Sequence, residues 1–66
     1  MWRRIGTNEV QSKEKRLVMR ADSPDIGVYL EVWEDDRCVA DYLQDSLEMA
    51  KEEALERFGV PFDLWG

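Results

Sequence analysis

Three segments of the chain alternate apolar and polar side chains with the two-residue period of a β-strand. They cover residues 16–22, 28–34 and 37–43, and the short sequences between them are typical of turns. Residues 23–27 contain serine, proline, aspartate and glycine, and the second turn is Asp35-Asp36. Short connections join antiparallel neighbours, so we expect these strands to form a meander.

A single segment, residues 46–58, has helical periodicity. Asp45, followed three residues later by Glu48, predicts a capping box at its start. Gly59 and Pro61 predict its end. At 100° per residue the apolar side chains fall in one stripe and glutamates occupy the rest. The stripe consists of Leu47, Ala50, Ala54 and Phe58, with Leu55 on its flank.

The predicted fold is therefore α+β, an antiparallel meander with one C-terminal helix packed on one face. Residues 2–10 form either a fourth strand, paired with residues 16–22, or an extended arm. The meander then has three or four strands, and residues 1–66 form one small domain. The tail Phe62-Asp63-Leu64-Trp65 is expected to pack on the second sheet face or on a neighbouring subunit.

The strand register follows from keeping apolar residues together on one side of the sheet. We expect Glu34 opposite Arg37, Leu17 opposite Val32 and Met19 opposite Leu30. Asp41 is then the one charged residue on the face toward the helix. That face is predicted to contain Leu17, Met19, Ala21, Val28, Leu30, Val32, Val39 and Leu43.

The second face of the sheet is predicted to be rich in aromatic and arginine side chains. Arg16 is expected opposite Trp33 and Arg20 opposite Tyr29, which favours cation–π contacts. A single helix covers only one face. The second face therefore either binds a partner or is covered within the chain by Trp2, Ile5 and the tail. It is predicted to contain Arg16, Val18, Arg20, Tyr29, Glu31, Trp33, Cys38, Ala40 and Tyr42.

The residue types argue against catalysis and against a metal site. The chain has no histidine and one cysteine, Cys38, so it lacks a nucleophile–base pair and a zinc ligand set. The acidic turn at residues 34–36 lacks the spacing of a calcium loop, and the glycines are too scattered to cradle a phosphate. We predict that the protein is not an enzyme, with no catalytic residue, cofactor, metal or small-molecule substrate.

Size and cysteine content favour a cytoplasmic protein that self-associates. A chain of 66 residues buries only about 60 % of the surface that its unfolded form exposes. A lone cysteine makes no intrachain disulfide, so association with another copy is the remaining source of stability, and the cytoplasm is the expected compartment. No apolar run reaches the roughly 20 residues that span a bilayer, so no membrane association is expected.

Charge is unevenly distributed along the chain. Residues 1–20 contain six basic and two acidic side chains, whereas residues 21–66 contain three and thirteen, for a net charge of −6. One alternative function is therefore an acidic inhibitor, of antitoxin or immunity type, that binds a basic partner. A second alternative is nucleic-acid binding by the basic N-terminal segment, which the overall negative charge opposes.

Residues 27–58 contain a strand, an acidic hairpin, a second strand and then Asp45-Ser46-Leu47-Glu48-Met49-Ala50-Lys51-Glu52-Glu53-Ala54. This arrangement resembles the strand–strand–helix core of HicB-like antitoxin domains and of short uncharacterised bacterial proteins, over about half the chain. The proline and glycine usual between the HicB strands are replaced here by residues 34–37. The resemblance implies a partner-binding domain rather than an antitoxin as such.

The leading prediction is a small non-catalytic protein–protein interaction module that forms a homodimer through the second sheet face. Tyr29, Trp33 and Tyr42 are the predicted anchors, and Arg16 and Arg20 orient the partner, because interfaces are enriched in these residue types. The biological process, the identity of a partner other than self and the number of subunits do not follow from the sequence.

Overall fold

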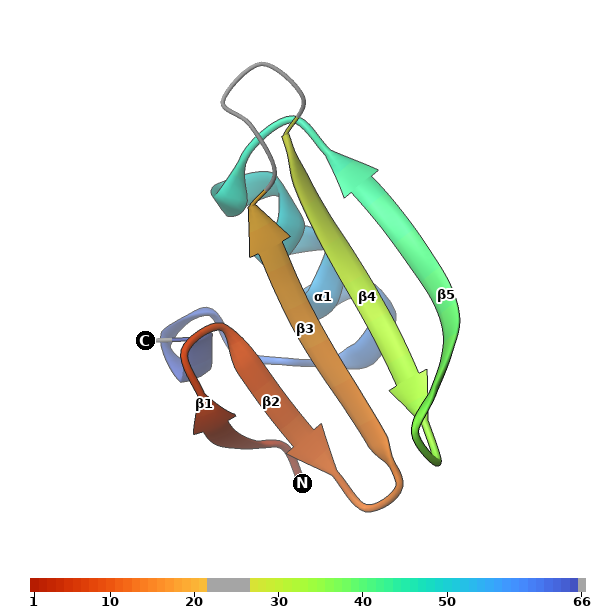
Figure 1. Cartoon of the computed structure of the whole chain (residues 1–66). Helices are drawn as coiled ribbons and strands as arrows, with labels where there is room; N and C mark the ends of the chain where they lie inside the picture. The colour runs from red at the N-terminus through yellow and green to blue at the C-terminus, as the bar shows by residue number, and fades with distance from the viewer. Residues whose placement is uncertain (22–26, 66) are drawn as a thin grey trace.

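The computed structural model describes residues 1–21 and 27–65, which form one antiparallel sheet followed by a helix (Figure 1). Within these residues there are five strands, in the order β1-β2-β3-β4-β5. The α+β class is confirmed, but the predicted three or four strands are too few. The elements are β1 Arg3–Gly6, β2 Glu9–Ser12, β3 Lys15–Ala21, β4 Val28–Glu34, β5 Arg37–Gln44, the helix α1 Leu47–Phe58 and the 3-10 helix η1 Phe62–Trp65.

The additional strand comes from the N-terminal segment, which folds into a hairpin instead of one strand or an arm. β1 and β2 are joined by a turn at Thr7-Asn8, where Asn8 adopts a φ of 58°. Asparagine tolerates this left-handed conformation. β2 then pairs with β3, with Val10 opposite Leu17. Four-residue strands are too short to show a clear alternation, which is why the sequence pattern concealed them.

The register of the two central strands is confirmed. Leu17 lies opposite Val32 and Met19 opposite Leu30. The hairpin between β4 and β5 turns at Asp35 and Asp36, whose φ angles of 51° and 65° suit the two positive φ values of a type I′ turn. The predicted turn between β3 and β4 lies largely outside the described residues.

The register of β5 departs from the prediction because of a β-bulge. Glu34 lies opposite Arg37 as expected, but the register then shifts and Val32 lies opposite Ala40. Val39 is the extra residue, and beyond it the two faces of the strand are exchanged. Placing Val39 and Leu43 in the core was wrong, since they are 50 % and 51 % exposed.

The bulge has a physical reason that concerns Asp41. In an unbroken register this carboxylate would point at the helix and be desolvated without a partner, which is costly. The shift places Asp41 on the solvent side and turns Ala40 and Tyr42 toward the helix, where they pack against the core.

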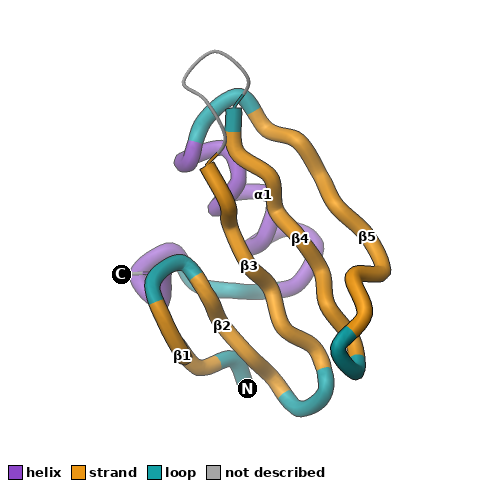
Figure 2. The backbone as a smooth tube through the Cα atoms, viewed as in Figure 1, coloured by secondary structure: helices purple, strands orange, loops and turns teal. Residues whose placement is uncertain are grey.

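The core lies between the sheet and a layer made of α1 and η1. Figure 2 shows these helical segments on one side of the strands. Ala50 and Ala54 of α1 are buried against the sheet, and among the described residues no charged side chain is buried. The buried residues are Val10, Leu17, Met19, Val28, Leu30, Val32, Ala50, Ala54, Val60 and Trp65.

Both ends of the chain close this same core. Trp65 is only 1 % exposed, and η1 contacts α1, β1 and β2. Trp2 also packs against the core, and its indole Nε1 donates a hydrogen bond to the carbonyl oxygen of Phe58 at 2.8 Å. The expectation that Trp2 and the tail cover the second sheet face, or that the tail packs on another subunit, was therefore wrong.

The limits of α1 follow from its caps. Ser46 is the N-cap, and its Oγ accepts a hydrogen bond from the Met49 amide at 3.2 Å. The capping residue is thus one position later than the Asp45 predicted. Gly59 ends the helix with a left-handed φ of 73°, as expected for a glycine C-cap.

Candidate interaction surface

The side of the sheet that faces away from α1 and η1 is called the open face. Figure 1 is viewed from this side, and both helical segments lie behind the strands. Strand alternation and register give its residues: Arg3, Glu9, Gln11, Arg16, Val18, Arg20, Tyr29, Glu31, Trp33, Cys38, Asp41 and Leu43.

The open face is arranged as rows that run across the strands. In the first row, Arg16 of β3 lies opposite Trp33 of β4. In the middle row, Val18 lies opposite Glu31, and in the third row Arg20 lies opposite Tyr29. β3 therefore contributes two cations around a valine, whereas β4 contributes two aromatic rings around a carboxylate.

Two cation–π contacts join these strands, as predicted. The guanidinium carbon of Arg16 lies 5.4 Å from the centre of the Trp33 ring, and that of Arg20 lies 5.6 Å from the Tyr29 ring. Each contact contributes about 0.5–1 kcal/mol at an exposed site. The aromatic rings are half-buried and held in place by side chains of the neighbouring strand.

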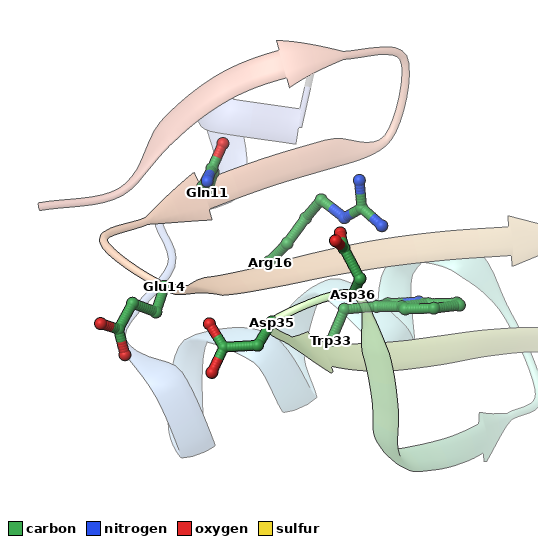
Figure 3. Close-up of a pocket in the computed structure, with 6 residues that line it drawn as sticks. All are labelled: Gln11, Glu14, Arg16, Trp33, Asp35 and Asp36. Atoms are coloured by element: carbon green, nitrogen blue, oxygen red, sulfur yellow. The ribbon is translucent and has the colours of Figure 1, made fainter.

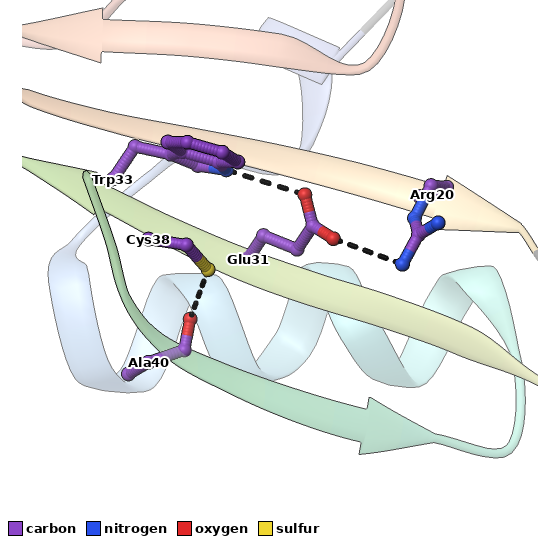
Figure 4. A network of polar contacts seen from close by, with 5 residues as sticks. All are labelled: Arg20, Glu31, Trp33, Cys38 and Ala40. Carbon is purple, nitrogen blue, oxygen red and sulfur yellow. Dashed lines mark hydrogen bonds and ion pairs between the residues drawn. The ribbon is translucent and has the colours of Figure 1, made fainter. Parts of the chain in front are cut away.

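Glu31, in the middle row, connects the first and third rows through both of its carboxylate oxygens (Figure 4). Its Oε1 accepts a hydrogen bond from the Trp33 indole at 3.2 Å, and its Oε2 lies 3.1 Å from Nη2 of Arg20. The Glu31 side chain is 15 % exposed, against 66 % for Arg20. Partial burial strengthens these polar contacts and limits the rotamers open to the group.

One end of the open face is hollowed into a pocket of about 270 Å³ (Figure 3). Trp33 and Arg16 contribute from the strands, and carboxylates contribute from the two adjacent turns. A lining of mixed charge fits a polar or charged group better than an apolar one. The lining residues are Gln11, Glu14, Arg16, Trp33, Asp35 and Asp36.

The strand residues of the open face have balanced charges, although the whole chain has a net charge of −6 and the adjacent turns add Glu14, Asp35 and Asp36. The N-terminal basic residues are divided between the two sides of the sheet. The ammonium of Lys15 lies on the helix side, 5.6 Å from the centre of the Phe58 ring and 3.6 Å from the Glu34 carboxylate. The charged residues of the open face are Arg3, Arg16, Arg20, Glu9, Glu31 and Asp41.

The structure brings together four of the five predicted site residues, and Tyr42 is the exception. The bulge turns Tyr42 to the helix side, where the guanidinium of Arg57 lies 4.7 Å from its ring centre. Arg57 also forms an ion pair with Glu53, and the hydrogen bond and charge of Glu53 raise the pKa of Arg57. Tyr42 thus supports the packing of α1 on β5.

Leu43 takes the place on the open face that the sequence had assigned to Tyr42. It lies opposite Tyr29 and is 51 % exposed, and Asp41 joins the same face. The signal that pointed to this exchange was Asp41 itself, because a lone carboxylate on a predicted core face indicates a shifted register.

Cys38 lies on the open face as an exposed thiol, and its Sγ is 3.5 Å from the carbonyl oxygen of Ala40. In the described part of the chain, no group of three or more metal-ligating side chains comes together. None of the helices in residues 1–21 and 27–65 has the length and apolar character needed to cross a membrane.

Comparison with known proteins adds no relative. No family model, no curated protein and no solved structure matches this chain.

Proposed function

We propose that the protein is a non-catalytic protein–protein interaction module that self-associates through the open face. The observation that carries this proposal is that α1, η1 and Trp2 all pack on one side of the sheet. The other side retains Tyr29 and Trp33 with their paired arginines. Tyrosine, tryptophan and arginine dominate binding energy at interfaces when their side chains are held in place before binding.

The size of the face is consistent with such a role. A typical stable interface removes about 800 Å² of accessible surface from each partner. The chain exposes 4537 Å² in total, so an interface of that size would cover about 18 % of it. One side of a two-layer protein supplies an area of this order. An exposed thiol such as that of Cys38 also suits the cytoplasm, where thiols remain reduced.

The test is the mass of the protein in solution, measured by light scattering at micromolar concentration. We expect the wild type to have twice the chain mass of 7.8 kDa, and Trp33→Glu to be monomeric and still folded by circular dichroism. Met49→Glu is the matched control, because Met49 is an exposed apolar residue on α1. A monomeric wild type, or dissociation by Met49→Glu instead of Trp33→Glu, would refute the proposal.

The alternative of an acidic inhibitor has one observation in its favour. Glu48, Glu52 and Glu56 are exposed on α1 and follow one another at four-residue spacing, where like charges repel. A basic partner would relieve that repulsion. This alternative predicts that the chain captures a cationic protein and that added salt releases this protein steeply. Replacing the three glutamates by glutamine should abolish the capture.

Nucleic-acid binding is the weakest of the three candidates. Only part of the basic segment lies on the open face, and its arginines are accompanied there by Glu9, Glu31 and Asp41. A basic stripe that follows a phosphate backbone needs cations on one surface without such acids. A mobility shift with single- or double-stranded probes at low salt would restore this candidate.

A further inference from the structure

We infer that two copies of the chain pack open face to open face, with β3 of each copy lying over β4 of the other. This inference rests on the proposed self-association and adds the arrangement of the partner copy. It follows from the distribution of side chains on the two central strands, with the arginines on β3 and the aromatic rings and Glu31 on β4.

Symmetry leaves two arrangements to compare. A homodimer of this kind joins identical patches through a two-fold axis, and packed sheets keep their strands within about 30° of one another. If the axis runs along the strands between β3 and β4, each β3 lies over the β4 of the partner copy. If the axis runs across the strands, β3 lies over β3 and β4 lies over β4.

The arrangement with the axis across the strands brings like charges together. It reverses the order of the rows, so that Arg16 lies over Arg20 of the partner copy. The middle row stays over itself, and Glu31 then lies over Glu31 of the partner copy. Like charges opposed within an interface cost several kcal/mol, so this arrangement is disfavoured.

The arrangement with the axis along the strands keeps each row over its own counterpart. Arg16 then lies over the Trp33 ring of the partner copy, and Arg20 lies over the partner copy's Tyr29. Both arginines flank the partner copy's Glu31, whose oxygens retain lone pairs beyond the two contacts made within the chain. Cation–π and ionic contacts are formed twice, once on each side of the axis.

At the edge of this interface a like-charge contact remains. β2 of one copy lies over β5 of the other, which brings Glu9 near Asp41 of the partner copy. This pair is at the rim, where solvent and salt screen it, and it supplies a test in which a mutation is expected to tighten the dimer. Asp41 is exposed, so replacing it does not disturb the core.

The experiment measures the dimer dissociation constant by sedimentation equilibrium at low salt. Asp41→Lys should tighten the dimer roughly tenfold, because two rim repulsions become two attractions. Asp63→Lys is the control, since it changes the net charge equally on an exposed residue of η1. Arg16→Glu should weaken the dimer by about tenfold or more, because a carboxylate then lies over an aromatic ring and beside Glu31.

The outcomes separate this inference from the proposed function. A dimeric wild type with the expected effects of Asp41→Lys and Arg16→Glu supports both. If Arg16→Glu tightens the dimer, a carboxylate is pairing with Arg20 of the partner copy, so the axis runs across the strands and this inference is wrong. If Asp41→Lys has no more effect than Asp63→Lys, the inference is also wrong. In both cases self-association stands, whereas a monomeric wild type refutes the proposed function itself.

Discussion

Gly27 is the position at which the smallest substitution is expected to have the largest effect on folding. Its φ is 117°, a backbone conformation that residues with a side chain rarely adopt. A Cβ added there would lie 2.2 Å from the carbonyl oxygen of Gln44, a backbone atom at the end of β5. Both groups in this close contact belong to the backbone and cannot rotate away as a flexible side chain would. The substitution therefore has to move one strand relative to the other.

The size of the effect can be worked out from these two terms. A strained backbone costs about 1–3 kcal/mol, and overpacking of a well-packed site costs about another 1–3 kcal/mol. A domain of 66 residues has a free energy of unfolding of roughly 3–10 kcal/mol. We therefore expect Gly27→Ala to remove about half of the stability or more.

Two other glycines provide matched controls. Gly59 has a φ of 73° but open space around an added Cβ, so Gly59→Ala should lose only the left-handed backbone term of about 1–2 kcal/mol. An added Cβ at Gly6 meets nothing closer than 3.7 Å, and Gly6→Ala should be nearly neutral.

The assay is urea unfolding followed by tryptophan fluorescence, with all variants at one low protein concentration because association adds stability. With a slope of about 1 kcal/mol per molar urea, Gly27→Ala should lower the midpoint by at least about 2 M or unfold the chain outright. If Gly27→Ala and Gly59→Ala have equal free energies of unfolding, the close contact with Gln44 is not rigid and the reasoning is wrong.

Three further predictions concern the helix side of the sheet and the N-cap of α1. Tyr42→Glu should lower the melting temperature in circular dichroism, because it places a carboxylate under α1; an effect on dimer mass alone would contradict the observed register. Trp65→Phe should change the free energy of unfolding little, since the buried indole N–H has no acceptor among the described residues. Trp65→Ala should cost about 3–5 kcal/mol, and similar losses for both variants would contradict this account. Ser46→Ala should cost about 1 kcal/mol in urea unfolding, whereas Asp45→Ala should cost less, and the reverse order would restore the predicted capping box.

The central part of the fold could be predicted from the sequence because its signals are local. β4 was predicted at its observed limits. β3 begins one residue earlier than predicted, and its predicted last residue, Asp22, lies outside the described residues. Each has seven residues, long enough for alternation to be recognised. The Gly59 cap and the pairing of Arg16 with Trp33 followed from turn chemistry and strand register alone.

What could not be predicted depends on contacts between distant parts of the chain. β1 and β2 have four residues each, which is too short for a clear alternation. Both strands contact η1, which contains the buried Trp65. The bulge at Val39 depends on the cost of burying Asp41 beneath a helix, which no local propensity contains. Tyr42 was therefore assigned to the wrong face, while the other four site residues, all on strands without a bulge, were placed correctly.

The bulge at Val39 also determines which changes of length β5 can accommodate. Substituting Val39 leaves the length of β5 unchanged. Its half-exposed side chain is not part of the core, so the substitution should have little effect. Removing Val39 itself would close the bulge and leave Ala40 opposite Val32 and Asp41 opposite Glu31, so the side chains that follow would keep their faces. A residue inserted between Ala40 and Asp41 would instead turn Asp41 toward the helix and Tyr42 into water. At this edge of the sheet, deletion of Val39 should therefore be tolerated far better than that insertion.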